Sequence, residues 1–277
     1  MTETVLITGC SSGIGRETAR VFLEDGWEVY ATARNPADVQ SIGDAGANIA
    51  TLDVTDDGDI ERVVDRMLDE QGRIDCLVNN AGYAQLGPVE DVPVESVEDQ
   101  FEVNVFGPHR LARAVLPNMR ERRTGTIVNI SSVAGRLSSP GMGIYAGSKF
   151  AMEGITDALR PEASEYGIDV VLVEPGPVET AFAERTNGEL EGIDRSDGYE
   201  TLYSLLDDTE AIGGGGPGAI PPREVAETIL DAANLTDPAP RYSVGQVAKV
   251  ALLGRFVPAK LRDKFYRLAL SLLSRVG

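Results

Sequence analysis

Short apolar runs alternate with segments of helical periodicity along the first 180 residues of the chain. Each apolar run has the length and composition of a strand that is buried on both faces of a parallel sheet. The expected strands are Thr4–Thr8, Trp27–Ala33, Ile49–Val54, Ile74–Asn79, Thr126–Ser131 and Asp169–Glu174. Between them, apolar residues spaced three and four apart predict amphipathic helices. These helices are expected at Arg16–Asp25, Asp59–Gln71, Ser96–Met119 and Tyr145–Tyr166, the last two with approximate ends.

Strands that alternate with helices in this way predict one fold class. Because a crossover between parallel strands is right-handed, the helices cover both faces of the sheet. We therefore expect an α/β fold with a doubly wound parallel sheet, the Rossmann fold. The pattern weakens after Pro175, where a polar and then glycine-rich stretch extends to Ala219, and a further helix is predicted at 223–235. No linker or internal repeat interrupts the chain, so residues 1–277 are expected to form a single domain.

The chain is strongly acidic, with 44 Asp and Glu against 25 Lys and Arg and a net charge of −19. Such a surface repels a phosphate backbone, which argues against nucleic-acid binding. Residues 241–277 hold eight basic residues and one acidic residue, a net charge of +7, so the other 240 residues carry −26. Only four of the 25 basic residues are Lys. This composition resembles an adaptation to a cytoplasm of high salt, where screening reduces self-repulsion.

Cysteine and histidine are too scarce for several kinds of site. The two cysteines, Cys10 and Cys76, are too few for a disulfide framework or a cysteine-based zinc site. His109 is the only histidine, which excludes a multi-histidine metal site and argues against a Ser-His-Asp hydrolase. We therefore predict no metal site and a structural role for His109. Neither a signal peptide nor an apolar run of membrane-spanning length is visible, so we expect a cytoplasmic protein.

A glycine-rich turn follows the first strand and precedes a helix, with the sequence Thr8-Gly9-Cys10-Ser11-Ser12-Gly13-Ile14-Gly15. Glycines in this context permit a tight turn and a close approach of the backbone to a pyrophosphate. The helix N-terminus offers backbone N–H groups to the anion. The spacing G-x-x-x-G-x-G differs from the generic dinucleotide pattern G-x-G-x-x-G. The strand–loop–helix context favours nucleotide binding over an ordinary glycine-rich turn.

Three further segments follow this turn in chain order: Asn79-Asn80-Ala81-Gly82, then Asn129-Ile130-Ser131-Ser132 ahead of Tyr145-x-x-x-Lys149, and Pro175-Gly176. With these segments the chain resembles the short-chain dehydrogenase/reductase family over roughly residues 3–182. The likeness extends to an NADP-dependent subgroup that includes hydroxysteroid and retinol dehydrogenase-like members. The resemblance implies a cofactor-binding and catalytic core at 1–182, a variable substrate loop at 183–222 and a C-terminal helical extension at 223–277.

Tyr145 and Lys149 suit proton transfer to a carbonyl oxygen. Hydride transfer to a carbonyl leaves an alkoxide that must receive a proton. A tyrosine with a pKa near 10 is a poor acid–base group near neutral pH, and a neighbouring cation lowers that pKa. Residues four apart on a helix lie on one face, one turn from each other. The alternative is a surface Tyr that happens to lie near a Lys.

The family resemblance implies a role for each catalytic residue. Tyr145 would be the general acid/base, and Lys149 would lower its pKa and hydrogen-bond the nicotinamide ribose. Ser132 would orient the substrate oxygen, with the adjacent Ser131 as the alternative. Asn104 matches the helix asparagine that supports a proton-relay water near the lysine; the alternative is a satisfied polar residue inside a helix.

The end of the second strand distinguishes NADP from NAD. NAD enzymes usually place an acidic residue there to bind the ribose 2′-hydroxyl. This chain has Ala33 at that position, followed by Arg34. A guanidinium can bind a 2′-phosphate in a bidentate way, so NADP(H) is preferred over NAD(H). The alternative is a solvated surface arginine.

The remaining cofactor contacts follow from the resemblance. Asp53 and Val54 match the adenine-binding position, although Asp53 and Thr55 are also candidates for a helix N-cap. Thr180 would contact the nicotinamide carboxamide and Val178 would lie beside the ring. The full expected set is Gly9, Ser11, Ser12, Gly13, Ile14, Gly15, Arg34, Asp53, Val54, Asn80, Ala81, Gly82, Tyr145, Lys149, Pro175, Gly176, Val178 and Thr180.

These features predict an NADP(H)-dependent oxidoreductase that interconverts a carbonyl compound and a primary or secondary alcohol. Apolar residues ahead of Tyr145 and after Phe182 favour a lipophilic substrate. One alternative is a sugar-nucleotide epimerase or dehydratase, which shares the Rossmann core and Y-x-x-x-K but differs in glycine spacing. A second is a catalytically silent NADP-binding regulator, which would typically lack part of the set Asn104, Ser132, Tyr145 and Lys149.

The C-terminal tail from Pro258 combines apolar and basic positions. Leu261, Phe265, Leu268, Leu272 and Val276 recur at spacings of three and four, accompanied by Lys260, Arg262, Lys264 and Arg267. A basic amphipathic helix of this kind could make a weak contact with an anionic membrane surface. It could instead pack on the acidic body or on a second subunit, which together are the favoured alternatives. Family members are often dimers or tetramers, so a homo-oligomer is expected.

Overall fold

Seven parallel strands form one sheet in the computed structural model, which describes residues 2–180, 190, 192–207 and 218–273. The strand order is β3-β2-β1-β4-β5-β6-β7. Every neighbouring pair is parallel. The strands are β1 (Thr4–Ile7), β2 (Glu28–Ala33), β3 (Asn48–Thr51), β4 (Cys76–Asn79), β5 (Gly125–Ile130), β6 (Ile168–Pro175) and β7 (Arg241–Val244). The expected doubly wound parallel sheet is thereby confirmed.

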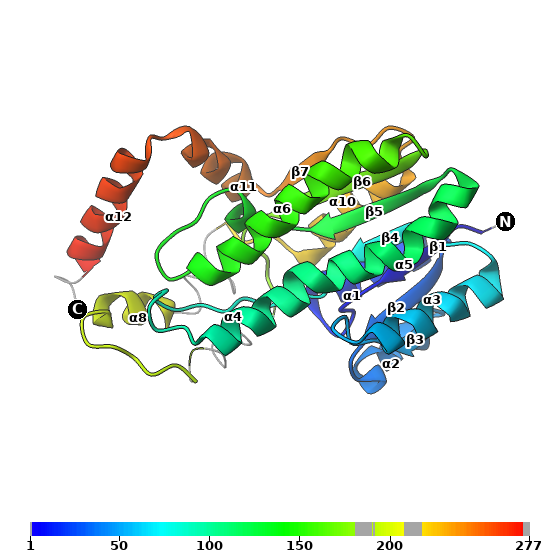
Figure 1. The fold of residues 1–277 in the computed structure, drawn as a ribbon, viewed down its shortest axis with the longest axis horizontal. Coiled ribbons are helices and arrows are strands. Elements are labelled where there is room, and N and C mark those ends of the chain that lie inside the picture. The colour runs from blue at the N-terminus through cyan, green and yellow to red at the C-terminus, as the bar shows by residue number, and fades with distance from the viewer. Residues whose placement is uncertain (1, 181–189, 191, 208–217, 274–277) are drawn as a thin grey trace.

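Helices cover both faces of the sheet (Figure 1). The α-helices are α1 (Gly13–Glu24), α2 (Gln40–Gly43), α3 (Asp57–Gln71), α4 (Val94–Phe101), α5 (Gly107–Arg122), α6 (Gly143–Ser164), α8 (Glu200–Leu206), α10 (Pro222–Asn234), α11 (Gln246–Ala251) and α12 (Ala259–Leu273). Apolar residues of α1 and α10 pack on one face, around Phe22 and Ile229. Those of α3, α5 and α6 pack on the other, around Met67, Leu111 and Ala163. Largely apolar central strands between two helical layers account for the buried sheet.

The structure differs from the sequence-based expectation at two elements. The helix expected at Ser96–Met119 is α4 and α5 joined by a π-helical turn, η2 (Glu102–Phe106). The seventh strand, β7, was not expected. Its residues Arg241, Tyr242 and Ser243 are only half-buried because it forms the edge of the sheet, so it lacks the apolar run that marks a buried strand.

Short helices complete the chain. Three are 3₁₀-helices: η1 (Pro36–Val39), η3 (Val133–Gly135) and η4 (Leu252–Phe256). The segment α11–η4–α12 extends from one end of the molecule, and α12 contacts α8 there (Figure 1). No helix within the described residues is both long and apolar enough to cross a membrane. Much of the expected substrate loop at 183–222, including 183–189, 191 and 208–217, lies outside the described residues.

Candidate active site

The strand order brings the predicted motifs to one edge of the sheet. β1 lies between β2 and β4, so the direction of the chain across the sheet reverses beside β1. In such sheets, ligands bind outside the carboxyl ends of the strands at this reversal. Gly9 follows β1, Asn80 follows β4, Ser132 follows β5 and Gly176 follows β6. Four motifs that are far apart in the sequence therefore share one edge.

The glycine turn needs glycine for two physical reasons. Gly9 and Gly13 have φ angles of +72° and +55°, a region that other residues rarely adopt. At Gly15, a Cβ would lie 2.4 Å from the Gly9 carbonyl oxygen, which is too close for any side chain. Ser12 precedes α1 with extended backbone, so the first N–H groups of α1 lie at this turn. The turn has the geometry of an anion-binding helix N-terminus.

Asn80 and Thr8 hold the segment after β4 against the glycine turn. The Asn80 Nδ2 donates to the carbonyl oxygens of Thr8 and Gly9, at 2.8 and 3.1 Å. The Thr8 hydroxyl accepts from the backbone N–H groups of Asn80 and Ala81, both at 3.0 Å. Asn80 therefore has a structural role in this site, because its amide bridges two loops.

The loop after β6 closes on the same turn. Pro175 ends β6, and Val178 makes a parallel bridge to Ile220. A Cβ at Gly13 would lie 3.0 Å from the Thr180 Cγ2. Thr180 is thus in contact range of the glycine turn, as expected of a residue that lines the same cofactor site. Ser11 lies on the glycine turn, Ile14 is the second residue of α1, and Gly176 lies on the loop after β6.

Tyr145 and Ser132 meet at the start of α6. Tyr145 is the third residue of that helix and is 7% exposed. Burial raises the pKa of its phenol to about 12, while a hydrogen bond from Ser132 acts in the opposite direction. The Ser132 Oγ also accepts from the Ala134 N–H at 3.1 Å, which fixes its orientation as the N-cap of η3. Ser132, and not Ser131, is the serine that contacts Tyr145.

Lys149 lies one turn further along α6 and is 5% exposed. Its Nζ donates to the Ile130 carbonyl oxygen at 2.8 Å and lies 5.9 Å from the centroid of the Tyr145 ring. Burial lowers its pKa to about 8, and the nearby Glu153 carboxylate opposes that shift. We expected Lys149 to bring the Tyr145 pKa below its ordinary value. Burial dominates instead, so the phenol is a weaker acid than expected.

Asn104 lies in the π-helical turn η2 and is fully buried. Its Oδ1 accepts from the Tyr83 N–H at 3.2 Å, and its Nδ2 donates to the Tyr83 carbonyl oxygen and to the Ser148 Oγ. Ser148, which the sequence did not single out, in turn donates to the Tyr145 carbonyl oxygen at 2.7 Å. A π-helical turn often occurs at functional sites. Asn104 is therefore linked to α6, at Tyr145, through Ser148.

Gly82 lies between Asn104 and Lys149. A Cβ at this glycine would lie 2.9 Å from the Asn104 Oδ1 and 3.7 Å from the Lys149 Nζ. The segment after β4 thus passes close to the Lys149 ammonium. The structure therefore brings Asn104, Ser132, Tyr145 and Lys149 together with the loops expected to hold a cofactor.

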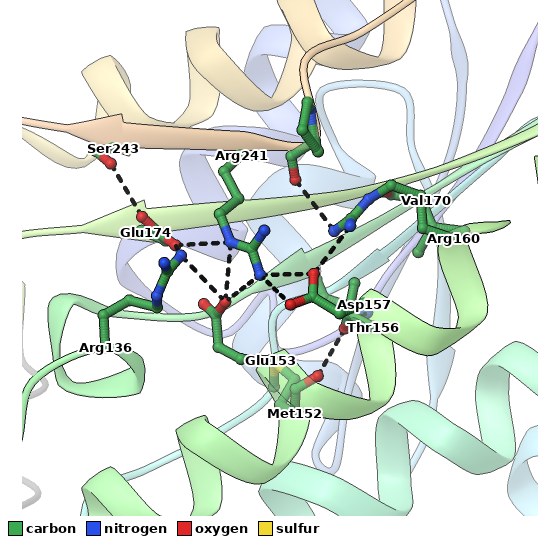
Figure 2. A network of polar contacts seen from close by, with 12 residues as sticks. Arg136, Met152, Glu153, Thr156, Asp157, Arg160, Val170, Glu174, Arg241 and Ser243 are labelled. Atoms are coloured by element: carbon green, nitrogen blue, oxygen red, sulfur yellow. Dashed lines mark hydrogen bonds and ion pairs between the residues drawn. The ribbon is translucent and has the colours of Figure 1, made fainter.

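A buried ionic network surrounds Glu153, which lies one turn after Lys149 on α6; Figure 2 shows this network. Glu153 and Glu174 are 4% and 1% exposed. The Arg136 guanidinium lies 2.9 Å from Glu174, and the Arg241 guanidinium lies 3.1 Å from Glu153 and 3.3 Å from Glu174. Arg241 also binds Asp157 at 2.6 Å. Two arginines on different elements thus neutralise buried carboxylates from α6 and β6.

The segments after β2 and β3 contain the residues expected to contact the adenosine part of the cofactor, and the N-cap of α3 there differs from the expectation. Arg34 follows β2 and is exposed. Arg16, which the sequence did not single out, donates through Nη2 to the carbonyl oxygens of Ser11 and Asp38, the latter at 3.1 Å. The N-cap of α3 is Asp56, and not Asp53 or Thr55. The Asp53 Oδ1 accepts from the Thr55 N–H at 2.9 Å, and Val54 is buried.

The residues that could bind a metal are dispersed. His109 lies exposed on α5, while Cys10 and Cys76 are buried free thiols. Burial raises the pKa of both thiols, the Cys10 value to about 12. Within the described ranges, no three residues among His, Cys, Asp and Glu form a group that could hold a metal ion.

A dinucleotide-type turn, a buried Tyr–Ser–Lys cluster and a doubly wound sheet define an oxidoreductase of the Rossmann class. A family model described as short chain dehydrogenase matches residues 3–191. The chain belongs to the short-chain dehydrogenase/reductase family, whose members use a nicotinamide cofactor.

Similar proteins agree with this assignment. The chain is 36% identical to 3-ketodihydrosphingosine reductase of Bacteroides thetaiotaomicron over 251 residues, which cover 90% of each chain. It is 35% identical to human 17-beta-hydroxysteroid dehydrogenase type 1, over 86% of this chain and 76% of that protein. A crystal structure of a short-chain dehydrogenase from Streptomyces avermitilis superposes with a TM-score of 0.80 at 34% identity, covering 100% of this chain and 97% of that one.

Proposed function

We propose that this protein is an NADP(H)-dependent reductase of lipophilic carbonyl compounds, acting through Tyr145 as the proton donor. One observation carries the proposal: the Tyr145 phenol and Ser132 meet in a buried site, with Lys149 one helical turn behind. In this arrangement, the hydroxyls of Tyr145 and Ser132 would both hydrogen-bond a substrate carbonyl oxygen, and the Lys149 ammonium supplies a positive charge near the phenol.

The residues present fit a nicotinamide dinucleotide. The positive φ angles at Gly9 and Gly13 form a cradle for a pyrophosphate next to the start of α1. Asn80, Ala81 and Gly82 would line the adjoining wall, with Val178 and Thr180 opposite. The reduced cofactor, when bound, supplies the hydride. Lys149 would hydrogen-bond the ribose; Gly82 supports this role, because a Cβ there would come within 3.7 Å of the Lys149 Nζ.

Arg34 supports NADP(H) over NAD(H), since it occupies the end of β2 where an acidic residue would favour NAD. Arg16 adds a second guanidinium near the same loop, because it reaches the Asp38 carbonyl in η1. Two guanidinium groups suit a dianionic 2′-phosphate.

The protonated form of Tyr145 suits proton donation in the reductive direction. A phenol with a pKa near 12 stays protonated at neutral pH, which is the form needed to donate a proton to an alkoxide. Ser132 orients the carbonyl oxygen toward the Tyr145 hydroxyl, and Lys149 stabilises the phenolate left after donation. Asn104 and Ser148 position α6 through the Tyr145 carbonyl oxygen.

The surroundings of Tyr145 support a lipophilic substrate. Tyr145 packs in an apolar cluster with residues from the loop before α6 and from α8. The members beside it include Met142, Ile144, Leu202, Tyr203 and Leu206. The two relatives named above act, by their names, on a ketosphingoid and on hydroxysteroids. We also expect a cytoplasmic homo-oligomer, a dimer or a tetramer.

Replacing Tyr145 with Phe tests the proposal. Removing the hydroxyl removes the proton donor, so kcat for NADPH-dependent reduction of long-chain ketones should fall by about 10²–10⁴-fold. Binding of NADPH, measured by fluorescence, should change little. Tyr166→Phe is the matched control, because Tyr166 lies in the turn after the end of α6, far along the chain from Tyr145, and is 40% exposed.

Retained turnover in Tyr145→Phe would refute the assigned acid. Tight NADPH binding by the unmodified protein, with no turnover across a broad panel of carbonyls and alcohols, would favour the regulator instead.

A further inference from the structure

The C-terminal extension exposes a concentrated apolar surface. Nine of the 16 exposed large apolar side chains of the described residues lie within 26 consecutive positions. They are Val247, Val250, Leu253, Phe256, Val257, Leu261, Phe265, Leu268 and Leu272. Scattered exposed apolar residues are normal, but a contiguous group of this size marks an interaction surface. We call these nine residues the C-terminal apolar face.

The α12 part of this face lies on the side of the helix that the fold does not use. On α12, Leu261, Phe265, Leu268 and Leu272 form one stripe at helical spacing. Tyr266 lies on a different side of the helix, and its hydroxyl donates to the Ser138 carbonyl oxygen at 3.1 Å. α12 stands at one end of the molecule, beside α8 (Figure 1). The inner side of α12 is therefore used by the fold, and its outer stripe is left to solvent.

Basic residues accompany the apolar face. Residues 246–273 carry six basic side chains and one acidic one, for a net charge of +5 in a protein of −19. On α12, Lys260, Lys264 and Arg267 are exposed. Apolar side chains flanked by Lys and Arg are typical of helices that lie in the interface of an anionic membrane.

A second copy of the chain fits this face less well. Pairing two C-terminal extensions would bring together two segments of like charge, which repel each other. The acidic body would attract the basic residues, but the other seven exposed large apolar side chains are spread from Val89 to Leu235.

We propose that the C-terminal apolar face, with its flanking basic residues, docks on an anionic lipid surface. α12 has 15 residues and is about 22 Å long, shorter than the roughly 30 Å of a bilayer core, so it lies in the interface plane. α12 stands at one end of the molecule (Figure 1), so the acidic body does not have to lie flat on the lipid. Salt at 0.1 M screens its repulsion from anionic headgroups beyond about 10 Å.

The position of α12 has a consequence that rests on the proposed function. Its partner Ser138 lies in the loop that leads to Tyr145, and η4 reaches the same loop, where Leu137 lies within 3.1 Å of a Cβ built at Gly254. Docking would place this loop close to the membrane surface. A lipophilic carbonyl compound could then pass from the lipid to the site without crossing bulk water.

Vesicle sedimentation with the full-length protein tests the docking surface. Wild-type protein should bind vesicles of equal parts phosphatidylcholine and phosphatidylglycerol about tenfold or more tightly than vesicles of phosphatidylcholine alone. The preference should shrink as KCl is raised, within the range where circular dichroism shows a folded protein. Because no turnover is measured, failure here leaves the Tyr145 assignment untouched.

Two sets of variants separate the apolar and the charged contributions. The triple variant Leu261→Ser, Phe265→Ser and Leu268→Ser should bind anionic vesicles at least about tenfold more weakly. The charge variant Lys264→Glu with Arg267→Glu should lose the preference for anionic lipid. Val94→Ser is the matched control, because Val94 and Phe265 are both 67% exposed and Val94 lies on α4, outside the face.

Three outcomes would overturn the proposal. The first is wild-type protein that does not bind the anionic vesicles. The second is binding that both variant sets leave unchanged. The third is a wild-type oligomer that the triple variant dissociates in sedimentation velocity, without vesicle binding, which would make the face a subunit interface.

Discussion

Lys149 and Glu153 lie one turn apart on α6, and their opposite charges influence each other inside the protein. Burial works against the charged form of both groups, since it lowers the pKa of Lys149 to about 8 and raises that of Glu153. Lys149 was recognisable from its motif. The sequence did not reveal Glu153, Ser148 or Arg16 as residues of interest. Each depends on partners that only the fold brings near.

Glu153→Gln should move the pH dependence of catalysis. The Glu153 charge raises the pKa of Lys149, so its removal lowers that pKa further below 8 and the ammonium is lost at lower pH. In this variant Arg136 and Arg241 lose one counter-charge, so their positive charges also lower the pKa of Lys149. The negative charge of Glu174 opposes this effect. The high-pH limb of kcat/KM should shift down by roughly one pH unit.

Asp157→Asn is the control for this shift, because Asp157 also binds Arg241 but leaves Glu153 charged (Figure 2). Its pH profile should match the wild type. Identical profiles for Glu153→Gln and Asp157→Asn would contradict the coupling to Lys149.

Arg34→Ala tests the cofactor preference. Losing charge-assisted hydrogen bonds to a 2′-phosphate should raise the KM for NADPH by about 10–100-fold. The KM for NADH, which has no such phosphate, should change little. Arg62→Ala, which removes an exposed arginine from α3, is the control. Equal effects of Arg34→Ala on both cofactors would contradict a 2′-phosphate contact.

At the scale of elements, β7 links the C-terminal part of the chain to the catalytic helix. Arg241, the first residue of β7, binds Glu153 and Asp157 of α6 and Glu174 of β6. The sequence pattern revealed the buried strands and most of the helices but not β7. A four-residue edge strand with half-buried polar positions has no periodicity to recognise.

Arg241→Ala should destabilise the protein. It leaves the buried Glu153 carboxylate without its nearest cation, and the free energy of unfolding should fall by about 2–4 kcal/mol. Urea unfolding followed by circular dichroism measures this loss. Arg223→Ala is the control, because its ion pair with Glu24 is exposed and should matter far less. An equal loss in both variants would contradict a special role for the buried network.

At the scale of the whole molecule, charge is the dominant feature. The net charge of −19 means that the surface carboxylates repel one another. Arg136 and Arg241 neutralise buried carboxylates. The C-terminal extension, in contrast, is basic. Other arginines, such as Arg62 and Arg223, form exposed ion pairs with surface carboxylates. The excess of Asp and Glu remains for the surface.

Stability should rise with KCl. Added salt screens repulsion between the many surface carboxylates, so the urea midpoint at neutral pH should increase from low to molar KCl. Activity with NADPH should follow the folded fraction. A protein that is equally stable and fully active without added salt would contradict the adaptation to a high-salt cytoplasm.

The sequence by itself determined the sheet class, the glycine turn and the pairing of Tyr145 with Lys149. These depend on local periodicity and short motifs, whose physical causes act within a few residues. Only the tertiary structure decided that burial, and not Lys149, dominates the Tyr145 pKa, and that Glu153 faces a cluster closed by Arg241. It also decided which side of α12 the body uses. Desolvation and ion pairing depend on which distant segments meet, and that information is absent from any local pattern.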